Sequence, residues 1–307
     1  MSPTNQATLE RPITSIASSV EENAFQMPKT AMSERKIKWV PTLYIGAMHV
    51  GALAAFFTFS WSALILCIVL HWITGGLGIT LCYHRLLTHR SFKVPKPVEY
   101  FLVVLASLAG QAGPISWVAA HRLHHARSDL PGDPHSPREG FFWAHMGWCL
   151  THNPAIDEFE DYKKFAPDLA KDPGLVFLDR FHILWTILLT VALYAWGGLS
   201  FVLWGICART VLVYHSTWFV NSATHKWGYQ TYRSSGDDST NLWWVALLTY
   251  GEGWHNNHHT FQSSARHGLK FWEFDTTYLM IQILGWLGLA KDIKLPSSHA
   301  LAARRSF

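Results

Sequence analysis

Long apolar segments alternate with polar segments along the chain. Residues 41–59 and 61–83 are adjoining apolar runs without a charged residue. Residues 181–198 and 199–219 are two more apolar runs, divided at a Gly-Gly pair, and Arg209 is the one charged residue in them. Each run has about the 20 residues that a helix needs to cross the hydrocarbon of a bilayer. The pattern therefore predicts an all-α integral membrane protein with four transmembrane helices, arranged as two hairpins.

Basic residues flank the first hairpin at its open end: Arg35, Lys36 and Lys38 precede it, and Arg85, Arg90, Lys93 and Lys96 follow it. The links within both hairpins carry no charge. Because positively charged loops remain on the cytoplasmic side of a membrane, the polar segments are expected there. Residues 84–180 and 220–296 would then form a cytoplasmic helical cap.

The predicted organisation has three parts. Residues 1–39 are polar and of mixed composition, so we expect a disordered tail. Residues 40–296 form the membrane domain with its cap, and residues 297–307 form a C-terminal tail. Residues 98–109 are apolar but too short to span, which predicts a helix buried in the cap or lying along the membrane interface.

Arg209 falls within the fourth span, where an arginine needs a partner, and none is evident from the sequence.

Composition agrees with a membrane protein and excludes other classes. Hydrophobic residues make up 49% of the chain and charged residues only 15%, with 16 Trp, whereas soluble domains are about a quarter charged. The formal net charge of +4 is too small to indicate nucleic-acid binding. The four cysteines form no C-x-x-C pair, so neither a disulfide framework nor thiolate metal binding is expected.

Eight histidines lie in three clusters, which are candidate metal ligands. HRLLTHR contains His84 and His89, HRLHH contains His121, His124 and His125, and HNNHH contains His255, His258 and His259. A lone histidine is usually a satisfied polar residue, but two repeats of the spacing i, i+3, i+4 are hard to obtain by chance. On a helix that spacing puts all three imidazoles on one face.

The three clusters fall on one side of the membrane if the chain crosses it four times. Imidazole suits iron, zinc, copper and nickel, and eight donors are enough for two ions. An all-nitrogen site beside lipid favours oxygen chemistry on an apolar substrate, which indicates iron because zinc has no redox chemistry. Acidic residues are sparse near the clusters, although Glu252 precedes HNNHH by three residues.

His84 and His89 have a different spacing from the other clusters. Residues five apart lie about 140° apart on an α-helix and do not share a face. We therefore predict that the second span ends near His84 and that a turn brings His89 back to the site.

The motifs GLGITLCYHRLLTHRSF, WVAAHRLHHARSDLPGDPHSP, GFFWAHMGW, TWFVNSATHKWG and GEGWHNNHH lie within residues 40–296. Over these residues the chain resembles membrane fatty acid desaturases of the delta-9 group, in particular the cyanobacterial acyl-lipid type. The resemblance implies two irons, Fe2+ in the reduced resting enzyme, with O2 as co-substrate. It also implies a ninth histidine ligand, His225, and a contact from Asn221 to iron through water.

The resemblance also implies a tunnel that holds the acyl chain. Its bend would be lined by Gln111, Trp117 and Thr217. Its closed end would lie at Trp72 and Gly76, which share a helix face. The hypothesis is that Trp72 limits chain length, and ordinary helix packing is the alternative.

Two departures from the animal acyl-CoA enzymes bear on the substrate. Those enzymes carry an Arg-Asp pair where this chain has Ala119 and Ala120. A basic pair that serves CoA is replaced by Thr151 and His152. Because phosphates favour Arg and Lys, the losses favour an acyl chain esterified to a membrane glycerolipid.

The resemblance implies oxygen-dependent introduction of a cis double bond at carbon 9 of saturated C16 or C18 acyl chains. No cytochrome b5-like HPGG segment is present, so an external donor is expected, ferredoxin in the cyanobacterial type. The membrane would be a plasma or thylakoid membrane, with the cap on its cytoplasmic side. The alternatives are an acyl-CoA delta-9 desaturase and a diiron hydroxylase or ketolase of a lipid or carotenoid.

Two other classes of membrane protein lack this chemistry. A haem electron carrier would use the lone histidines of the apolar spans: His49, His71, His182 and His215. A transporter would suit the spans but would leave the histidine clusters of the cap unexplained.

Overall fold

The structure is a computed structural model, and it describes residues 36–153, 156–234 and 236–306. Within these residues the fold is all-helical, with isolated bridging pairs and no β-strand. The predicted all-α class is confirmed. The predicted disordered tail falls almost entirely on residues 1–35, which lie outside the described residues.

In the part of the chain that the structure describes, three apolar helical segments are long enough to cross a membrane: Trp39–Thr58, Trp61–Thr88 and His182–His225. The first consists of α2 (Trp39–Ala55) and η2 (Phe56–Thr58), and the second of α3 (Trp61–His71) and η3 (Trp72–Thr88). The third consists of α9 (His182–Val202), η6 (Leu203–Ala208), α10 (Arg209–Ser222) and η7 (Ala223–His225).

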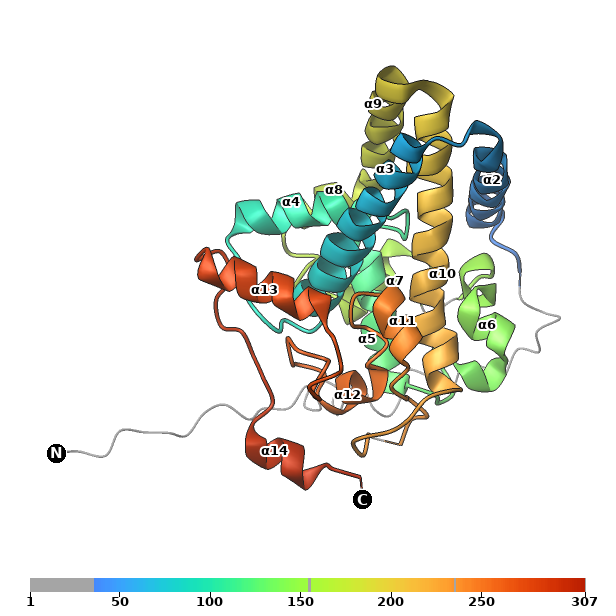
Figure 1. The fold of residues 1–307 in the computed structure, drawn as a ribbon. Helices are drawn as coiled ribbons and strands as arrows, with labels where there is room; N and C mark the ends of the chain where they lie inside the picture. The colour runs from blue at the N-terminus through green and yellow to red at the C-terminus, as the bar shows by residue number, and fades with distance from the viewer. Residues whose placement is uncertain (1–35, 154–155, 235, 307) are drawn as a thin grey trace.

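The third segment is not one straight helix. It is 44 residues long, and its backbone leaves helical geometry at Gly197 and at Gly198, which has φ +64°. Glycine accepts this left-handed conformation without a steric cost. In Figure 1 the chain turns over between α9 and α10 at the top of the picture.

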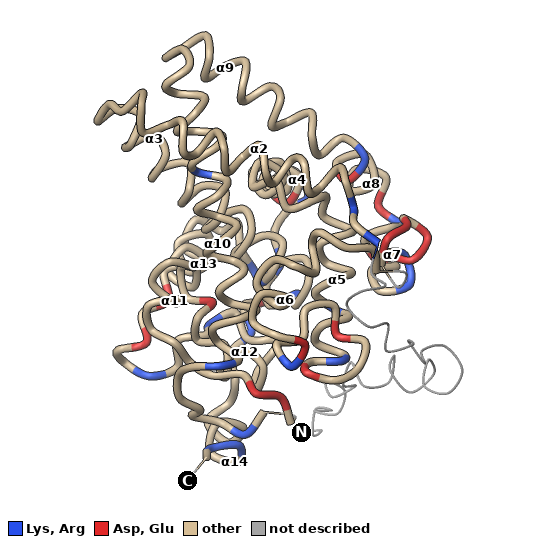
Figure 2. Tube along the Cα trace, turned by 90° about the vertical axis from the view of Figure 1, so that its right-hand side faces the viewer, with Lys and Arg blue, Asp and Glu red and all other residues tan. Residues whose placement is uncertain are grey.

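Charged residues are rare on the apolar helices. Figure 2 shows Lys, Arg, Asp and Glu mainly at the right and in the lower part of the molecule, away from the outer parts of α3 and α9. Large apolar side chains are exposed there instead, for example Phe57 at 91% and Trp196 at 73%. A surface of this kind suits contact with lipid rather than with water.

Small residues let the helices of this bundle approach closely. A Cβ added at Gly51 of α2 would lie 2.8 Å from Cβ of Cys207 in η6. On the other side of η6, a Cβ added at Gly205 would lie 2.6 Å from the Leu193 side chain of α9. The segment formed by η6 and α10 therefore lies between α2 and α9, and Figure 1 shows α10 standing between α3 and α2.

The second apolar helix does not end near His84, so that prediction was wrong. It continues to Thr88, and residues 72–88 form a π-helix. The backbone N–H of His89 donates to the carbonyl of His84 (3.1 Å), the bond between residues five apart that defines this geometry. The prediction assumed the α-helical period, which the chain does not keep here.

Arg209 has a partner that the sequence could not show. The side chain is completely buried. Its Nη1 donates to the carbonyl of Leu108 (2.5 Å) at the end of α4 (Lys96–Ser107), and its Nε donates to the carbonyl of Gly205 (3.0 Å). Carbonyl groups at a helix C-terminus attract a positive charge, so this contact joins the bundle to the cap.

The remaining helices form the cap below the bundle. They are α4, α5 (Pro114–Arg127), η4 (Pro137–Glu139), α6 (Phe141–His145), η5 (Gly147–Leu150), α7 (Phe159–Phe165), α8 (Pro173–Arg180), α11 (Trp243–Leu248), α12 (His255–Thr260), α13 (Thr276–Trp286) and α14 (Ser298–Ala303). In Figure 1, α4 and α13 lie across the base of the upright helices.

The short apolar helix predicted at residues 98–109 is α4. Leu102, Val103 and Ala106 are buried in the main core together with residues of η3. Phe101 on the opposite face is 61% exposed. One face of α4 therefore packs against η3 and the other is available to the membrane interface.

Both ends of the described chain form hydrogen bonds with the cap. Residues 36–38 pair with residues 150–152, through bonds from the Lys38 N–H to the Leu150 carbonyl and from the His152 N–H to the Lys36 carbonyl (both 2.8 Å). After α14, Arg304 donates to the carbonyl of Thr260 (2.9 Å). The predicted C-terminal tail thus contains a helix docked beside α12.

Candidate metal centre

The structure brings all nine predicted histidines into two adjoining groups. The first group contains His84, His89, His121, His125 and His258, and the second contains His124, His225, His255 and His259. Four elements supply them: the end of η3, α5, η7 and α12. Within each group the ligand atoms lie within 4.8 Å of one another.

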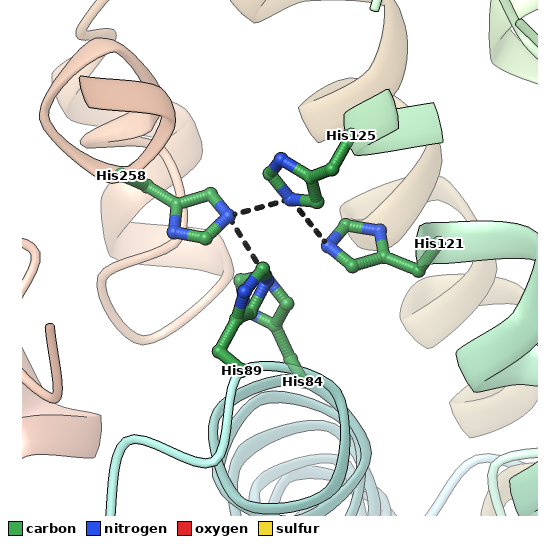
Figure 3. A group of neighbouring side chains, drawn as sticks. All are labelled: His84, His89, His121, His125 and His258. Atoms are coloured by element: carbon green, nitrogen blue, oxygen red, sulfur yellow. Dashed lines mark hydrogen bonds between the residues drawn. The ribbon is translucent and has the colours of Figure 1, made fainter. Parts of the chain in front are cut away.

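The first group converges through its Nε2 atoms, as Figure 3 shows. His258 Nε2 lies 3.1 Å from His84 Nε2 and 2.9 Å from His125 Nε2. His125 Nε2 in turn lies 3.0 Å from His121 Nε2. The ring of His89 stands nearly perpendicular to that of His84, with centroids 4.7 Å apart.

The second group lies deeper in the cap. His255 Nε2 is 3.1 Å from His225 Nε2. The Nε2 atoms of His124 and His259 are buried and have no hydrogen-bond partner. All four side chains are buried, and burying an imidazole nitrogen without a partner costs free energy.

Hydrogen bonding alone does not account for the first group. A neutral imidazole carries one N–H. His84 Nδ1 lies 2.8 Å from a carboxylate oxygen of Glu252, which calls for the proton on that nitrogen and leaves a lone pair on Nε2. His258 Nε2 faces both His84 and His125 but can donate to only one of them. Two nitrogen ligands that each lie about 2.1 Å from one metal ion, with an angle of about 90° at the ion, are about 3 Å apart. The observed spacing of the nitrogens and their unpaired lone pairs therefore fit a bound metal.

The surroundings favour the neutral form of five of these imidazoles. Burial, followed by the charges of neighbouring histidines, lowers the pKa of His89, His121, His125, His255 and His258 well below the usual value. Because metal binds the neutral imidazole, ligands with a low pKa do not need to lose a proton first.

Carboxylates hold the other nitrogen of four of these histidines. His124 Nδ1 lies 3.0 Å from Asp133, His225 Nδ1 3.0 Å from Asp129, and His259 Nδ1 3.1 Å from Asp237. With Glu252 beside His84, each of the four rings presents its Nε2 to the centre. Such partners fix ring orientation and raise the basicity of the ligand.

Two of these carboxylates face one further histidine each. Glu252 Oε2 lies 2.8 Å from His267 Nδ1, and Asp133 lies 3.9 Å from His135 Nδ1. Acidic residues that are sparse near the clusters along the sequence are thus brought beside them by the fold. Asp129 and Asp133 follow HRLHH within eight residues, in the motif RSDLPGD, and this closeness could have identified them as partners of the histidines. No feature of the sequence points to Asp237 or His267.

Glu252 is itself held in a buried ion-pair network. Arg85 Nε donates to Glu252 Oε1 (3.0 Å), and Arg85 Nη1 donates to Asp275 Oδ2 (3.0 Å). Burial alone would raise the pKa of Glu252, but Arg85, His84 and His267 hold it well below its usual range. An ionised carboxylate is therefore maintained beside His84.

A cavity begins at the histidines and runs between η3 and α10. His84, His121, His255 and Asn221 line one end, and His71 and Val213 line the other. Asn221 therefore lines the same cavity as His255, and its contact to a metal through water stays a prediction.

The residues predicted for the bend of an acyl tunnel are hydrogen-bonded to one another. Trp117 Nε1 donates to Gln111 Oε1 (3.2 Å), and Gln111 Nε2 donates to Thr217 Oγ1 (2.9 Å). Trp117 and Thr217 line the cavity. The Trp117 ring also stacks on His121, with centroids 5.0 Å apart.

The residues predicted for the closed end are not among those that line the cavity. Trp72 is 37% exposed. A Cβ at Gly76 would lie 3.1 Å from Trp72 Cδ1 and 3.3 Å from Tyr250 Cδ2. Trp72 and Gly76 do share a helix face, and Tyr250 covers Gly76 on its other side.

The histidines of the apolar helices have polar partners of their own. His49 Nε2 lies 3.1 Å from His215 Nε2, and His71 Nδ1 lies 2.6 Å from the hydroxyl of Tyr250. His182 Nδ1 bonds the carbonyl of Asp179 (2.6 Å). Each is satisfied where it stands, which removes the reason to assign these residues to haem.

Apolar helices that carry a histidine-rich candidate metal centre at one end are typical of a membrane-bound metalloenzyme. The sequence pattern of the fatty acid desaturase family matches residues 27–282. The chain belongs to this family.

Curated relatives cover most of the chain. An sn-1 stearoyl-lipid 9-desaturase of Anabaena variabilis is 54% identical over 262 residues, covering 85% of this chain and 95% of the relative. An sn-2 palmitoyl-lipid 9-desaturase of Nostoc sp. (strain 36) is 49% identical, covering 84% and 90%. An acyl-CoA C20 Delta5-desaturase of Anemone leveillei is 44% identical, covering 90% and 92%.

Proposed function

We propose that this desaturase introduces a cis double bond at carbon 9 of saturated C16 or C18 acyl chains esterified to membrane glycerolipids. The cavity that leads from the histidine centre between η3 and α10 carries the proposal. The cyanobacterial lipid 9-desaturases are 54% and 49% identical to the chain, and the plant acyl-CoA desaturase is 44% identical.

Two irons would occupy the two histidine groups. His84, His89, His121, His125 and His258 would hold one, and His124, His225, His255 and His259 the other, with Asn221 reaching one of them through water. The all-imidazole donor set and the unpaired buried nitrogens support this assignment. The irons would supply the oxidising chemistry, with O2 as co-substrate and water as its product.

The protein itself positions the acyl chain. Gln111, Trp117 and Thr217 would form the bend that places two neighbouring methylenes beside the centre, and their mutual hydrogen bonds make the bend rigid. Trp72 and Gly76 would contribute to the closed end. Holding the substrate in a reactive position accounts for a large part of the rate enhancement of such an enzyme.

The cap has no cationic cluster at the positions that serve CoA in the animal enzymes. Ala119 is completely buried and Ala120 is half-buried. His152 lies 2.9 Å from Asp157, which also pairs with Lys38. Positions 119, 120, 151 and 152 carry no arginine or lysine to bind a phosphorylated carrier, which supports a glycerolipid.

We also propose that the chain crosses the membrane four times, as two hairpins with the cap on the cytoplasmic side. The reversal at Gly197-Gly198 supports four crossings, because it divides His182–His225 into two helices. The basic residues beside the first hairpin support the orientation. A separate ferredoxin would then supply two electrons from the cytoplasmic side.

Expression of the chain in a host without unsaturated fatty acids tests this function. The expected product is a cis-9 double bond in C16 or C18 chains of the host glycerolipids, identified by lipid-class and double-bond analysis. A hydroxylated or keto product would indicate the rival oxidation instead. A product confined to the acyl-CoA pool would contradict the glycerolipid substrate.

A further inference from the structure

The end of the cavity away from the histidine centre carries three polar side chains that the reaction does not use. They are His71 on α3, Ser216 on α10 and Tyr250, which follows α11. His71 lies 13 residues before His84 along the same helical segment, so the two ends are at most about 20 Å apart. This is where the methyl end of a bound chain would lie.

The three side chains are hydrogen-bonded to one another in series. The Ser216 hydroxyl donates to the carbonyl of Leu212 (2.8 Å), so its oxygen is left to accept from His71 Nε2–H (3.4 Å). His71 Nδ1 then carries the lone pair and accepts the Tyr250 hydroxyl proton (2.6 Å). A neutral imidazole has one N–H and one acceptor, and both are used. All three side chains therefore use their hydrogen-bond donors within this group or on the backbone.

The ring of Tyr250 lies across the face of η3 where the helix has no side chains. A Cβ at Gly75 would lie 3.5 Å from Tyr250 Cε2, and a Cβ at Gly76 would lie 3.3 Å from Tyr250 Cδ2. Two consecutive glycines thus provide the space that the ring fills. Trp72 is the second neighbour of Gly76, since the same Cβ would lie 3.1 Å from Trp72 Cδ1, but Trp72 does not line the cavity.

The backbone of Tyr250 is held in an unusual conformation. Its φ is +58°, which is uncommon for a bulky residue and persists only where the surroundings enforce it. The enforcing contacts come from the start of α13: the Thr277 N–H (3.0 Å) and the Thr276 hydroxyl (3.2 Å) both donate to the Tyr250 carbonyl. The ring is thereby fixed from both ends, at its carbonyl and at its hydroxyl.

We propose that Tyr250, held by His71, closes the deep end of the cavity and sets the longest acyl chain that the enzyme accepts. The proposal rests on the proposed function, since it takes the cavity to hold a saturated acyl chain. The methyl end would meet the ring of Tyr250 when carbons 9 and 10 lie at the centre. Trp72 would add to the limit only after this ring is removed.

Two substitutions should move the chain-length preference in opposite directions. Tyr250→Ala removes the ring and lengthens the cavity. Gly75→Ala adds one methyl group to the cavity wall at ordinary contact distances, 3.5 Å from Tyr250, 3.7 Å from Val213 and 3.9 Å from His71, and so shortens the space without a clash. Tyr194→Ala is the matched control, because Tyr194 on α9 is 64% exposed and lies outside the cavity lining.

The test uses the full chain in a host without unsaturated fatty acids, supplied with saturated acids of several lengths. A contact worth one methylene changes selectivity about tenfold or more, so we expect changes of about tenfold in the ratio of longer to shorter monounsaturated products. Tyr250→Ala should raise that ratio, Gly75→Ala should lower it, and Tyr194→Ala should leave it unchanged.

The outcomes separate this inference from the proposed function. A wild-type ratio in both Tyr250→Ala and Gly75→Ala would overturn the role of Tyr250, and so would a shift in Trp72→Ala without one in Tyr250→Ala. If Tyr250→Ala does not accumulate, Gly75→Ala decides alone. The absence of any double bond with the wild-type chain would overturn the proposed function instead.

Discussion

The backbone N–H of His89 donates to the carbonyl of His84 (3.1 Å), and the two imidazole rings stand 4.7 Å apart, centroid to centroid. This bond belongs to the π-helix of residues 72–88. Because a π-helix pairs residues five apart, it brings two histidines of the spacing H-x-x-x-x-H to one centre. A regular α-helix would separate them by about 140°.

The first prediction concerns this helical register. Insertion of one alanine between Leu86 and Leu87 should rotate His89 away from His84 and reduce bound iron, measured per purified chain. The control is an alanine inserted between Phe59 and Ser60, in the link between the first two apolar segments, because links outside helices tolerate insertions. An unchanged iron content in the first variant would show that the register does not matter.

The second prediction concerns the carboxylate behind His84. Glu252→Gln keeps the size of the side chain but removes the charge that faces His84 and His267. Loss of such a partner usually costs about tenfold to a hundredfold in metal affinity, which an iron titration with a competing chelator would measure. Glu160→Gln is the control, since that side chain is 78% exposed and pairs with Lys163; equal affinities in the two variants would contradict the role of Glu252.

The third prediction concerns the packing of η3 against α4. A Cβ at Gly78 would lie 2.6 Å from Cα of Ala106, a backbone atom that cannot move aside independently. Gly78→Ala should therefore destabilise the protein by about 1–3 kcal/mol, visible as a lower melting temperature in detergent. Gly46→Ala on α2, where nothing lies within 4 Å, should melt like the wild type. Melting of Gly78→Ala at the wild-type temperature would show that the two helices can separate freely.

The fourth prediction concerns pH. Burial alone would raise the pKa of Asp168, but Arg122 and Arg90 lower it from 3.8 to about 2. The folded state therefore favours the ionised carboxylate, whose stabilising contribution is present above the unfolded pKa and is lost as the pH falls from 3.8 toward about 2.

Asp168→Asn removes that contribution at every pH. Its melting temperature should be below that of the wild type at about pH 5, and the difference should shrink toward about pH 2. Arg122 also donates to the carbonyl of Leu87 (3.0 Å), so the ion pair helps to hold α5 beside the end of η3. A difference that stays constant with pH would exclude ionisation of Asp168 as the cause.

The sequence was sufficient to predict the helical class, the apolar segments and the eight clustered histidines, because membrane length and imidazole clustering leave direct traces in residue order. His225 followed only from family resemblance, since a single histidine after an apolar helix has no spacing signal. Its partner Asp129 is 96 residues away along the chain.

The features that sequence reasoning missed depend on tertiary contacts. The π-helical register of η3 breaks the 3.6-residue period on which the reasoning relied. The partner of Arg209 is a backbone carbonyl, which no residue type signals. Tyr250 reaches the cavity because its backbone is left-handed, and hydrogen bonds from the start of α13 hold that conformation. A tyrosine in a loop does not indicate such a position from sequence.

Iron content of the full chain, purified in detergent and measured together with its protein concentration, tests the central claim most directly. Two groups of histidines predict two irons per chain, without the Soret absorption of haem. Replacement of His255, which belongs to the second group alone, should lower the content toward one. A wild-type stoichiometry of one iron or none after reconstitution with Fe2+, or a haem spectrum, would contradict the two-metal centre.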